Sequence, residues 1–240
     1  MPGPLSGVRV VELTSVVLGP WACQILADMG ADVIKVEPPN GDSNRQLGLA
    51  RHKGMAALYL TCNRNKRSVV LDVKQPAARE AVLDLVRTAD VFIHNNRPQV
   101  MTKLGLDYAA LKAVNPMLIY CGSYGYARRG PYGSKGALDD SIQSIAGVAM
   151  LNKLVLGEPR YLPTIIADKT TAITVVYGVL AALFARELID GQQRAFDVAR
   201  ILRCFDQQQV GAAFNKSLGL KVIAVAEFLE GSAAGDGDGL

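Results

Sequence analysis

Short apolar runs alternate with helix-periodic segments along the first half of the chain. Residues 8–13 and 32–37 are rich in β-branched residues, as in buried strands, and residues 21–29 between them have apolar positions at helical spacing. Pro20 stands at the first helical position and Gly30 follows the last one. A strand, a helix and a strand within about thirty residues predict a βαβ unit with parallel strands.

The same alternation continues further along the chain. We expect strands at residues 68–73, 91–94 and 117–122, and helices at residues 76–88, 108–114, 138–150, 169–188 and 196–214. Asp107 is a suitable N-cap for the helix at 108–114. The alternation predicts an α/β fold with an open, mostly parallel Rossmann-like sheet and flanking helices. Ligands of such sheets bind beyond the carboxyl ends of the strands, at the loops that begin here at Thr14, Pro38, His94 and Ser123.

The end of the chain has a different composition. Residues 231–240 are mainly Gly, Ala and Asp and show no apolar period, which is typical of a disordered tail. We therefore divide the chain into a folded portion, residues 1–217, and a divergent tail, residues 218–240.

Composition and charge narrow the class of ligand. Half of the 240 residues are apolar and a fifth are charged, which is typical of a globular protein. The net charge is +4, and the basic residues are scattered apart from short groups at 64–67 and 128–129. Nucleic-acid-binding proteins concentrate Lys and Arg on one face, so this distribution favours a small anionic ligand over a nucleic acid.

Cysteine usage and hydropathy favour a cytoplasmic protein. The four cysteines, Cys23, Cys62, Cys121 and Cys204, show no metal-ligand spacing and are too few to suggest a disulfide framework. The N-terminus has no secretory signal pattern. The longest apolar run, residues 172–185, is too short to span a bilayer and predicts a buried helix. We expect free thiols and no association with a membrane.

Several motifs of α/β enzymes are absent from the sequence. No Gly-x-Gly-x-x-Gly follows the first strand, and neither a phosphate-binding P-loop nor a Gly-x-Ser-x-Gly elbow is present. The only histidines, His52 and His94, are not at metal-ligand spacing. A dinucleotide-dependent oxidoreductase is therefore supported by the α/β pattern alone, and we expect no metal.

Twelve short segments carry a resemblance to a known family. They are residues 5–12, 18–20, 26–39, 63–68, 71–74, 89–91, 95–98, 104–106, 115–116, 130–132, 167–168 and 180–183. In this order they resemble the family III coenzyme A transferases, which include formyl-CoA transferase and carnitine-CoA transferase. The longest segment reads LADMGADVIKVEPP, and the resemblance extends over residues 5–186, the N-terminal part of the family's large domain.

The resemblance implies an enzyme that moves CoA from an acyl-CoA to a carboxylic acid through aspartyl-anhydride and aspartyl-CoA intermediates. In the family the attacking Asp lies just before a long apolar helix, which is the position of Asp168. An ionised carboxylate that forms a covalent intermediate divides one difficult step into easier ones. On the residues alone, Asp168 is also a suitable N-cap for a helix that starts at Lys169, and the two roles are compatible.

The resemblance also implies a set of CoA contacts. They are Val17, Pro38, Leu71, Lys74, Asn95, Asn96, Lys103 and Lys135. Val17 and Pro38 stand where formyl-CoA transferases carry Gln and Arg, and Asn96 stands where an aromatic residue is usual. Lysines bind phosphate as point charges. The alternatives are solvated surface charges for the lysines and a turn residue for Asn95.

Two departures from the family pattern bear on the expected reaction and on how far along the chain the resemblance extends. The racemase branch pairs the same Asp with a His, and Leu138 occupies that position here, so one of the two groups needed for proton exchange is missing. Of the Thr-Gly-x-Gly-Gln turn that follows the Asp helix in the family, only Gln193 fits. The family's small domain, which has a Gly-rich loop, does not follow.

We therefore expect an apparent C-terminal truncation. The alternative to an active transferase is a catalytically impaired fragment that binds CoA or interacts with a subunit. Family members form interlocked homodimers, so a homodimer is the implied assembly.

Overall fold

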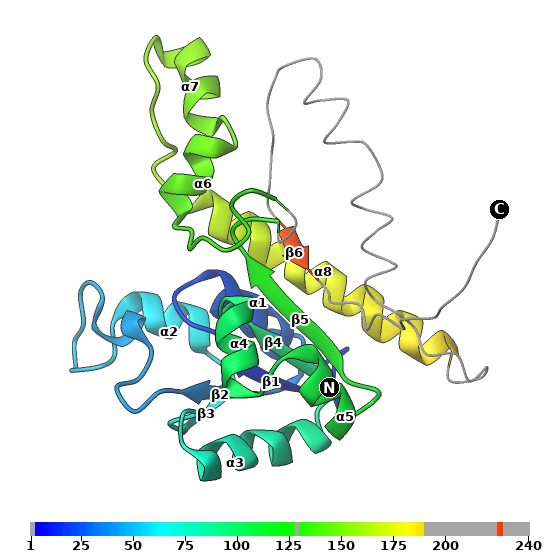
Figure 1. Ribbon diagram of the computed structural model, residues 1–240. Coiled ribbons are helices and arrows are strands. Elements are labelled where there is room, and N and C mark those ends of the chain that lie inside the picture. The colour runs from blue at the N-terminus through cyan, green and yellow to red at the C-terminus, as the bar shows by residue number, and fades with distance from the viewer. Residues whose placement is uncertain (1–2, 128–129, 190–224, 228–240) are drawn as a thin grey trace, which may run out of the picture.

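The centre of the computed structural model, which describes residues 3–127, 130–189 and 225–227, is a six-stranded sheet (Figure 1). The strands are β1 (Arg9–Leu13), β2 (Asp32–Glu37), β3 (Lys66–Val70), β4 (Val91–His94), β5 (Ile119–Tyr124) and β6 (Val225–Glu227). Their order is β3-β2-β1-β4-β5-β6, and only the β5–β6 pair is antiparallel. This confirms the predicted open, mostly parallel sheet. The strand order reverses between β1 and β4, the switch point at which ligands of such sheets bind.

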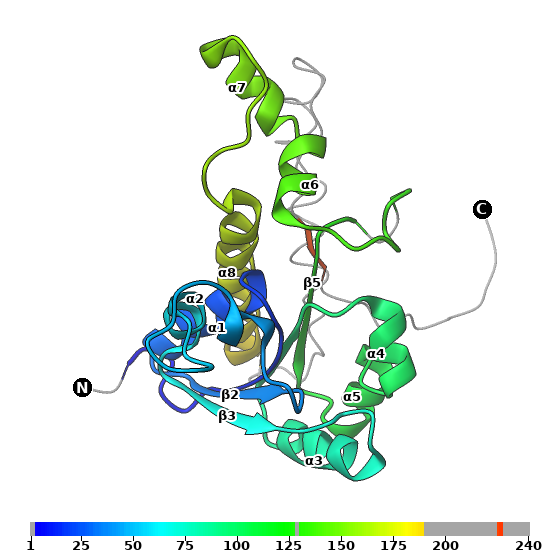
Figure 2. The same ribbon diagram turned by 90° about the vertical axis from the view of Figure 1, so that its left-hand side faces the viewer.

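Helices cover both faces of the sheet (Figure 2). They are α1 (Leu18–Asp28), α2 (Ala57–Asn63), α3 (Pro76–Arg87), α4 (Pro98–Leu104), α5 (Tyr108–Val114), α6 (Asp139–Ile145), α7 (Val148–Leu156) and α8 (Ile166–Ile189), with a 3₁₀ turn η1 (Ser43–Gln46). The predicted boundaries of β2, β4 and α5 are confirmed. Asp107 caps α5 as predicted, because its carboxylate accepts the Ala110 N–H at 3.1 Å.

Alternation along the strands creates two cores. Val10 and Ile93 face α1 and α8 in one apolar cluster, whereas Val11 and Phe92 face α3, α4 and α5 in the other. Neighbouring strand residues point to opposite faces, so both sides of the parallel strands are buried.

Helix α8 is longer than the apolar run that predicted it. By length and composition, Ile166–Glu187 is able to cross a membrane, so the shortness of the 172–185 run does not decide that question. In the fold, α8 packs against α1 and β5. Near its end, Arg186 pairs with Asp90 at 2.7 Å. Since Asp90 directly precedes β4, this ion pair places the end of α8 at the amino edge of the sheet.

Apart from shifts of one to three residues at the ends of β1, α1, α3 and α8, two predicted strands and one predicted helix differ from the structure. Strand β3 starts and ends earlier than residues 68–73, and β5 lies two residues after 117–122. The predicted helix at 138–150 is divided into α6 and α7, because Gly147 has a left-handed backbone with a φ of 79°. The pair α6–α7 extends away from the sheet in both views (Figures 1 and 2).

Some predictions fall outside the described residues. They are the helix at 196–214, the thiol of Cys204 and the 128–129 arginine pair. Within the expected tail, 218–240, the structure describes only β6. The three described cysteines are free, and all three are buried.

Candidate active site

Two side-chain amides tie the loop after β1 to the turn after β4. Asn95 donates to the Ser15 carbonyl oxygen at 2.8 Å and accepts the Ser15 N–H at 3.1 Å. Asn96 donates to the Leu13 carbonyl oxygen at 3.1 Å. Because β1 and β4 adjoin at the switch point, Asn95 and Asn96 lie at the expected ligand edge and hold its loop in shape.

Val17 and Pro38 lie on the same edge with little polar chemistry of their own. The Val17 side chain is buried just before α1, and Pro38 is exposed directly after β2. Directly before Val17 the backbone is constrained, since Val16 has a φ of 70°, a rare value for a β-branched residue. The Val16 carbonyl oxygen accepts the Asn44 amide, and its N–H donates to Asp42 at 3.4 Å.

A buried network of four charges supports these loops. Lys35 Nζ lies 3.0 Å from both Glu12 Oε1 and Asp42 Oδ2, and Lys66 Nζ lies 2.7 Å from Glu12 Oε2. Burial opposes the charge of Lys35, but the Glu12 and Asp42 carboxylates outweigh burial and raise the pKa of Lys35. Lys35 Nζ also donates to the Thr14 carbonyl oxygen at 3.0 Å. These ion pairs and the hydrogen bond to Thr14 therefore hold the loops after β1 and β2 in place.

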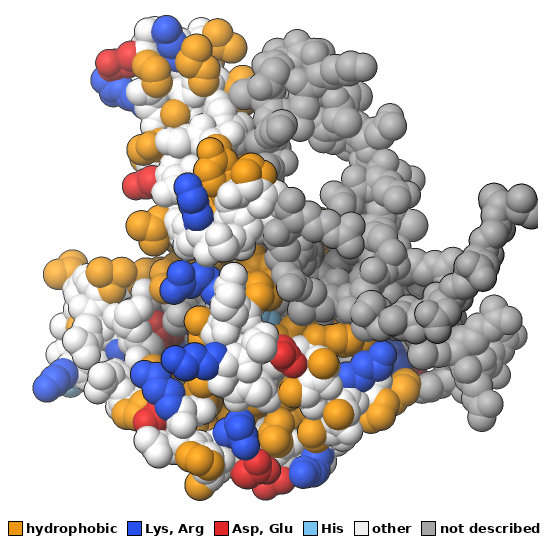
Figure 3. Space-filling view, viewed as in Figure 1, with side chains coloured by type: hydrophobic (Ala, Val, Ile, Leu, Met, Phe, Trp, Pro, Cys, Tyr) orange, Lys and Arg blue, Asp and Glu red, His pale blue; other side chains and the backbone are white. Residues whose placement is uncertain are grey.

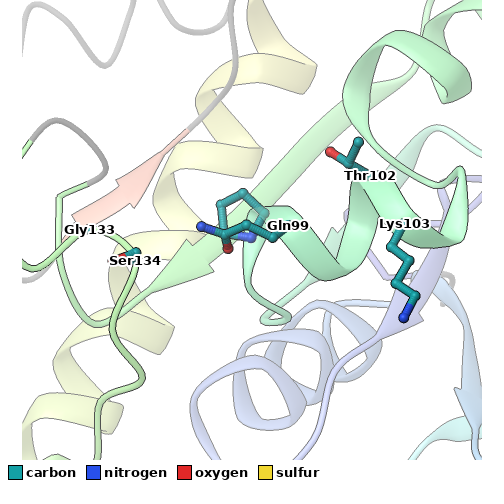
Figure 4. A pocket seen from close by; sticks show the side chains of 6 residues that line it. Gln99, Thr102, Lys103, Gly133 and Ser134 are labelled. Atoms are coloured by element: carbon teal, nitrogen blue, oxygen red, sulfur yellow. The ribbon is translucent and has the colours of Figure 1, made fainter.

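A cavity of about 590 Å³ lies between α4 and the loop before α6 (Figure 4). Its lining residues are Pro98, Gln99, Thr102, Lys103, Gly133 and Ser134. This volume is within the range of small-molecule sites. Lys135 follows in the same loop, with its Nζ 4.6 Å from the centre of the Tyr132 ring. Lys74 and Lys103 line a second, smaller cavity, and Leu71 packs half-buried against the core.

Asp168 lies inside the first turn of α8 and is hydrogen-bonded to α6. The N-cap alternative is wrong, because the helix starts two residues before Asp168. The Asp168 N–H donates to Asp139 Oδ2 at 3.0 Å, and Asp139 Oδ1 accepts Gln143 Nε2 at 2.6 Å. The buried Gln143 also accepts the Leu162 N–H at 2.9 Å. Gln143 thereby joins α6 to the segment that leads into α8.

The Asp168 carboxyl group is half-buried and lies near a second acid. Burial, and to a smaller extent the Asp139 charge, raise the pKa of Asp168 to about 6. A carboxylate that ionises this close to neutral pH is a candidate for nucleophilic or acid–base chemistry. Sequence reasoning missed Asp139, although it is adjacent to Leu138, which was compared with the racemase histidine.

The length of α8 places Asp168 at the ligand edge of the sheet. Asp168 precedes Arg186 by eighteen residues, about 27 Å along the helix axis. A strand of five residues spans only about 17 Å. Since Arg186 lies at the amino edge, Asp168 lies beyond the carboxyl edge, where Figure 1 shows the start of α8 beside α6. In the described part of the chain, no group of three or more His, Cys, Asp or Glu is placed to hold a metal ion.

The sequence model of CoA-transferase family III matches residues 5–216. The chain belongs to this family. It is 42% identical over 203 residues to the succinate–glutarate CoA-transferase of Agrobacterium fabrum, covering 82% of this chain and 50% of that protein. It is 39% identical over 188 residues to the acetyl-CoA:oxalate CoA-transferase of Acetobacter aceti, covering 77% and 48%. The chain spans about half the length of these curated relatives.

A solved structure shows the same family III architecture. The crystal structure of a CAIB/BAIF family protein from Brucella suis matches with a TM-score of 0.77 and 35% identity, over 95% of this chain and 60% of that one. The family III match runs from β1 beyond the end of α8, so it includes Asp168, Asp139 and the cations around both cavities.

Proposed function

We propose that this chain carries the CoA-binding and nucleophile-bearing part of a CoA transferase that moves CoA from an acyl-CoA to a carboxylic acid. The observation that carries the proposal is the position of Asp168. Its half-buried carboxyl group lies at the ligand edge of the sheet in a chain that matches family III. A cavity of suitable size with Lys103 in its wall lies at the carboxyl side of β4.

In the proposed reaction, the Asp168 carboxylate attacks the thioester carbonyl carbon of the acyl-CoA. The C–S bond breaks, which leaves an acyl-aspartyl anhydride and the CoA thiolate. The thiolate then attacks the aspartyl carbonyl, releasing the donor acid and forming an aspartyl-CoA thioester. The acceptor carboxylate attacks this thioester, and the returning thiolate takes up the acceptor acyl group and regenerates Asp168. Each step exchanges one acyl bond for another, as covalent catalysis requires.

The environment of Asp168 supports this role. A pKa of about 6 leaves the carboxyl group mostly ionised at neutral pH. Partial removal of water around it replaces hydration by fixed protein dipoles, which favours attack on a carbonyl group. Lys74, Lys103 and Lys135 supply positive charge for the CoA phosphates, and Asn95 and Asn96 hold the loop beside them.

The relatives suggest which substrates to test first. Their names include succinate, glutarate and oxalate, all short dicarboxylic acids. We extend this class to the present chain and propose succinyl-CoA as the first donor.

Trapping of the acylated carboxyl group tests the proposal. When the protein is incubated with succinyl-CoA and hydroxylamine, we expect mass spectrometry to find an aspartyl hydroxamate at Asp168. Asp168→Asn should abolish the product, whereas Asp140→Asn, in the first turn of α6, should not. A hydroxamate at another carboxyl group, or none in a protein that binds CoA, would contradict the assignment.

A second candidate function follows from the length of the chain relative to its family. Because it covers about half of each curated relative, the protein is also a candidate CoA-binding or subunit-interaction fragment without turnover. CoA binding by isothermal titration, together with turnover that Asp168→Asn leaves unchanged, would favour this function over catalysis.

We further propose a homodimer, for which the exposed apolar face of α7 is the main support. A cytoplasmic location and the absence of nucleic-acid and membrane partners remain predictions.

A further inference from the structure

The first turn of α8 is hydrogen-bonded to groups that lie outside the helix. The N–H groups of a first helical turn have no partner within the helix, so each needs an acceptor from elsewhere. The Ile166 N–H donates to the Thr164 carbonyl oxygen at 2.9 Å, and the Asp168 N–H donates to Asp139 Oδ2 at 3.0 Å. Asp139 is the first residue of α6, which lies beside the start of α8 (Figure 1). Helix α6 thus supplies a capping carboxylate to α8, a role that an N-cap side chain usually has.

The Gln143 side chain contacts both of these acceptors. It lies one turn along α6 from Asp139 and is only 1% exposed. Gln143 Nε2 donates to Asp139 Oδ1 at 2.6 Å and to the Thr164 carbonyl oxygen at 3.2 Å. Gln143 Oε1 accepts the Leu162 N–H at 2.9 Å. With two acceptors on one side and one donor on the other, a single orientation of the amide group satisfies all three contacts.

The other side-chain contacts of this segment are exposed to solvent. Lys169 Nζ donates to the Thr164 hydroxyl group at 2.6 Å, and Ser144 Oγ lies 2.7 Å from Tyr161 Oη. Water can replace either partner of an exposed contact, so its loss has little effect. The partners of a buried amide have no such replacement, and they stay unpaired when the amide is removed. Gln143 is therefore the contact on which the start of α8 depends more strongly.

We propose that Gln143 is a positioning residue for the nucleophile: its amide group orients the Asp139 carboxylate, which in turn holds the backbone of Asp168. The inference rests on the proposed function. With Oδ1 bound by Gln143, the Asp139 carboxylate keeps Oδ2 directed at the Asp168 N–H. The Cα atom of Asp168, from which the attacking carboxylate extends, is thereby fixed. Misplacement of a reacting group by about 1 Å slows a reaction by up to about a hundredfold.

The rate of hydroxamate formation at Asp168, measured over a range of succinyl-CoA concentrations, tests the inference. Gln143→Met keeps the length of the side chain without its hydrogen bonds. It should lower the maximal rate about tenfold or more and leave the CoA affinity, measured by isothermal titration, within about twofold of the wild type. Gln143→Glu keeps the shape but places an oxygen against Asp139, so it should be slowed at least as much. Ser144→Ala on the same helix is the matched control and should change neither quantity.

A double-mutant cycle establishes whether Gln143 acts through Asp139. Asp139→Ala should slow trapping about tenfold, and adding Gln143→Met to it should slow trapping by less than about threefold more, whereas independent effects would multiply to about a hundredfold. Multiplying effects would overturn the inference. So would a Gln143→Met protein that is trapped at the wild-type rate, or one that loses CoA affinity by the same factor as rate.

Hydrogen exchange measures the same contact without substrate. In Gln143→Met the amides of the first turn of α8, which include the Asp168 N–H, should exchange faster than in the wild type, while those of α3 should not change. Unchanged exchange at the start of α8 would show that Gln143 does not hold this turn, whatever the activity. If the wild-type protein forms no hydroxamate although Gln143 protects the turn, the proposed function fails, and the assignment of Gln143 to the reaction fails with it.

Discussion

Among the individual side chains, Asp139 is the neighbour that influences the ionisation of the candidate nucleophile, Asp168. Both oxygens of Asp139 accept hydrogen bonds, from the Asp168 N–H and from Gln143. The Asp168 carboxyl group is half-buried, and burial raises its pKa. Asp168 therefore gains and loses its proton near neutral pH.

The rate of Asp168 acylation should therefore depend on pH. We expect it to fall as the pH drops through about 6, because the protonated carboxyl group is a poor nucleophile. Asp139→Asn removes the charge that acts in the same direction as burial, so the acid limb should move to lower pH. Burial remains in that variant, so the midpoint should stay above the ordinary value of an aspartate. The pH profile of hydroxamate formation measures both effects.

Asp140→Asn is the control for this experiment, since Asp140 is exposed in the same helical turn. Its acid limb should match that of the wild-type protein. If the limb of Asp139→Asn also stays in place, Asp139 does not influence the ionisation of Asp168.

Among the secondary-structure elements, the turn from β1 into α1 has no room for an added side chain at Gly19. A Cβ atom on Gly19 would lie 2.4 Å from Thr14 Cβ and Cγ2. Thr14 is buried, its hydroxyl group donates to Glu12 at 2.6 Å, and its carbonyl oxygen accepts Lys35. A side chain at position 19 would therefore displace Thr14 and with it the loop after β1, which the charge network holds in place.

We expect Gly19→Ala to lower the free energy of unfolding by about 1–3 kcal/mol, the usual cost of overpacking. CoA binding should weaken as well, because the loop after β1 shifts. Urea denaturation measures the stability, and Gly136→Ala is the control, since a Cβ there meets nothing within 4 Å. Equal stability of the Gly19→Ala and wild-type proteins would show that the loop yields without cost.

The elements found from the sequence are those with a strong apolar pattern. Strands β2 and β4 are buried over almost their entire length, and their boundaries were predicted correctly. Helices α2 and α4 have seven residues each, like α5, but they were missed because neither has a side-chain N-cap such as Asp107. A signal for α4 was present, with Pro98 at its start and Gly105 in the left-handed conformation after its end. Strand β3 was displaced because its first residues, Lys66 and Arg67, are charged.

The candidate site was only partly predictable for a related reason. Asp168 and the lysines came from the resemblance, which preserves their order along the chain. Asp139 lies 29 residues from Asp168, and their contact depends on how α6 packs against α8. Lys35 is a second example, because a charged residue within a buried strand is explained only once Glu12 and Asp42 are placed around it.

Across the fold, the projecting pair α6–α7 leaves apolar side chains exposed to solvent. Helix α7 has no buried residue, and Leu154 and Val155 are 77% and 83% exposed. Figure 3 shows hydrophobic side chains over the end of this projection. Contiguous exposed apolar surface of this kind marks interaction sites.

We expect Leu154→Glu to shift the protein from dimer to monomer in sedimentation velocity experiments, since a charge would have to be buried in the interface. Leu49→Glu is the control, because Leu49, between η1 and α2, is 91% exposed. A Leu154→Glu protein that sediments like the wild type would argue against α7 as the dimer contact.

The 2.7 Å ion pair between Arg186 and Asp90 fixes one end of α8, and Asp168 lies near the other end, where its N–H donates to Asp139. Over about 27 Å, a tilt of only about 2° swings the tip by about 1 Å. Errors of about 1 Å in placing a reacting group can slow a reaction about a hundredfold. The partly buried Arg186–Asp90 pair at the opposite edge of the sheet thus helps to position Asp168, and defects in the proposed reaction can originate far from any bound substrate.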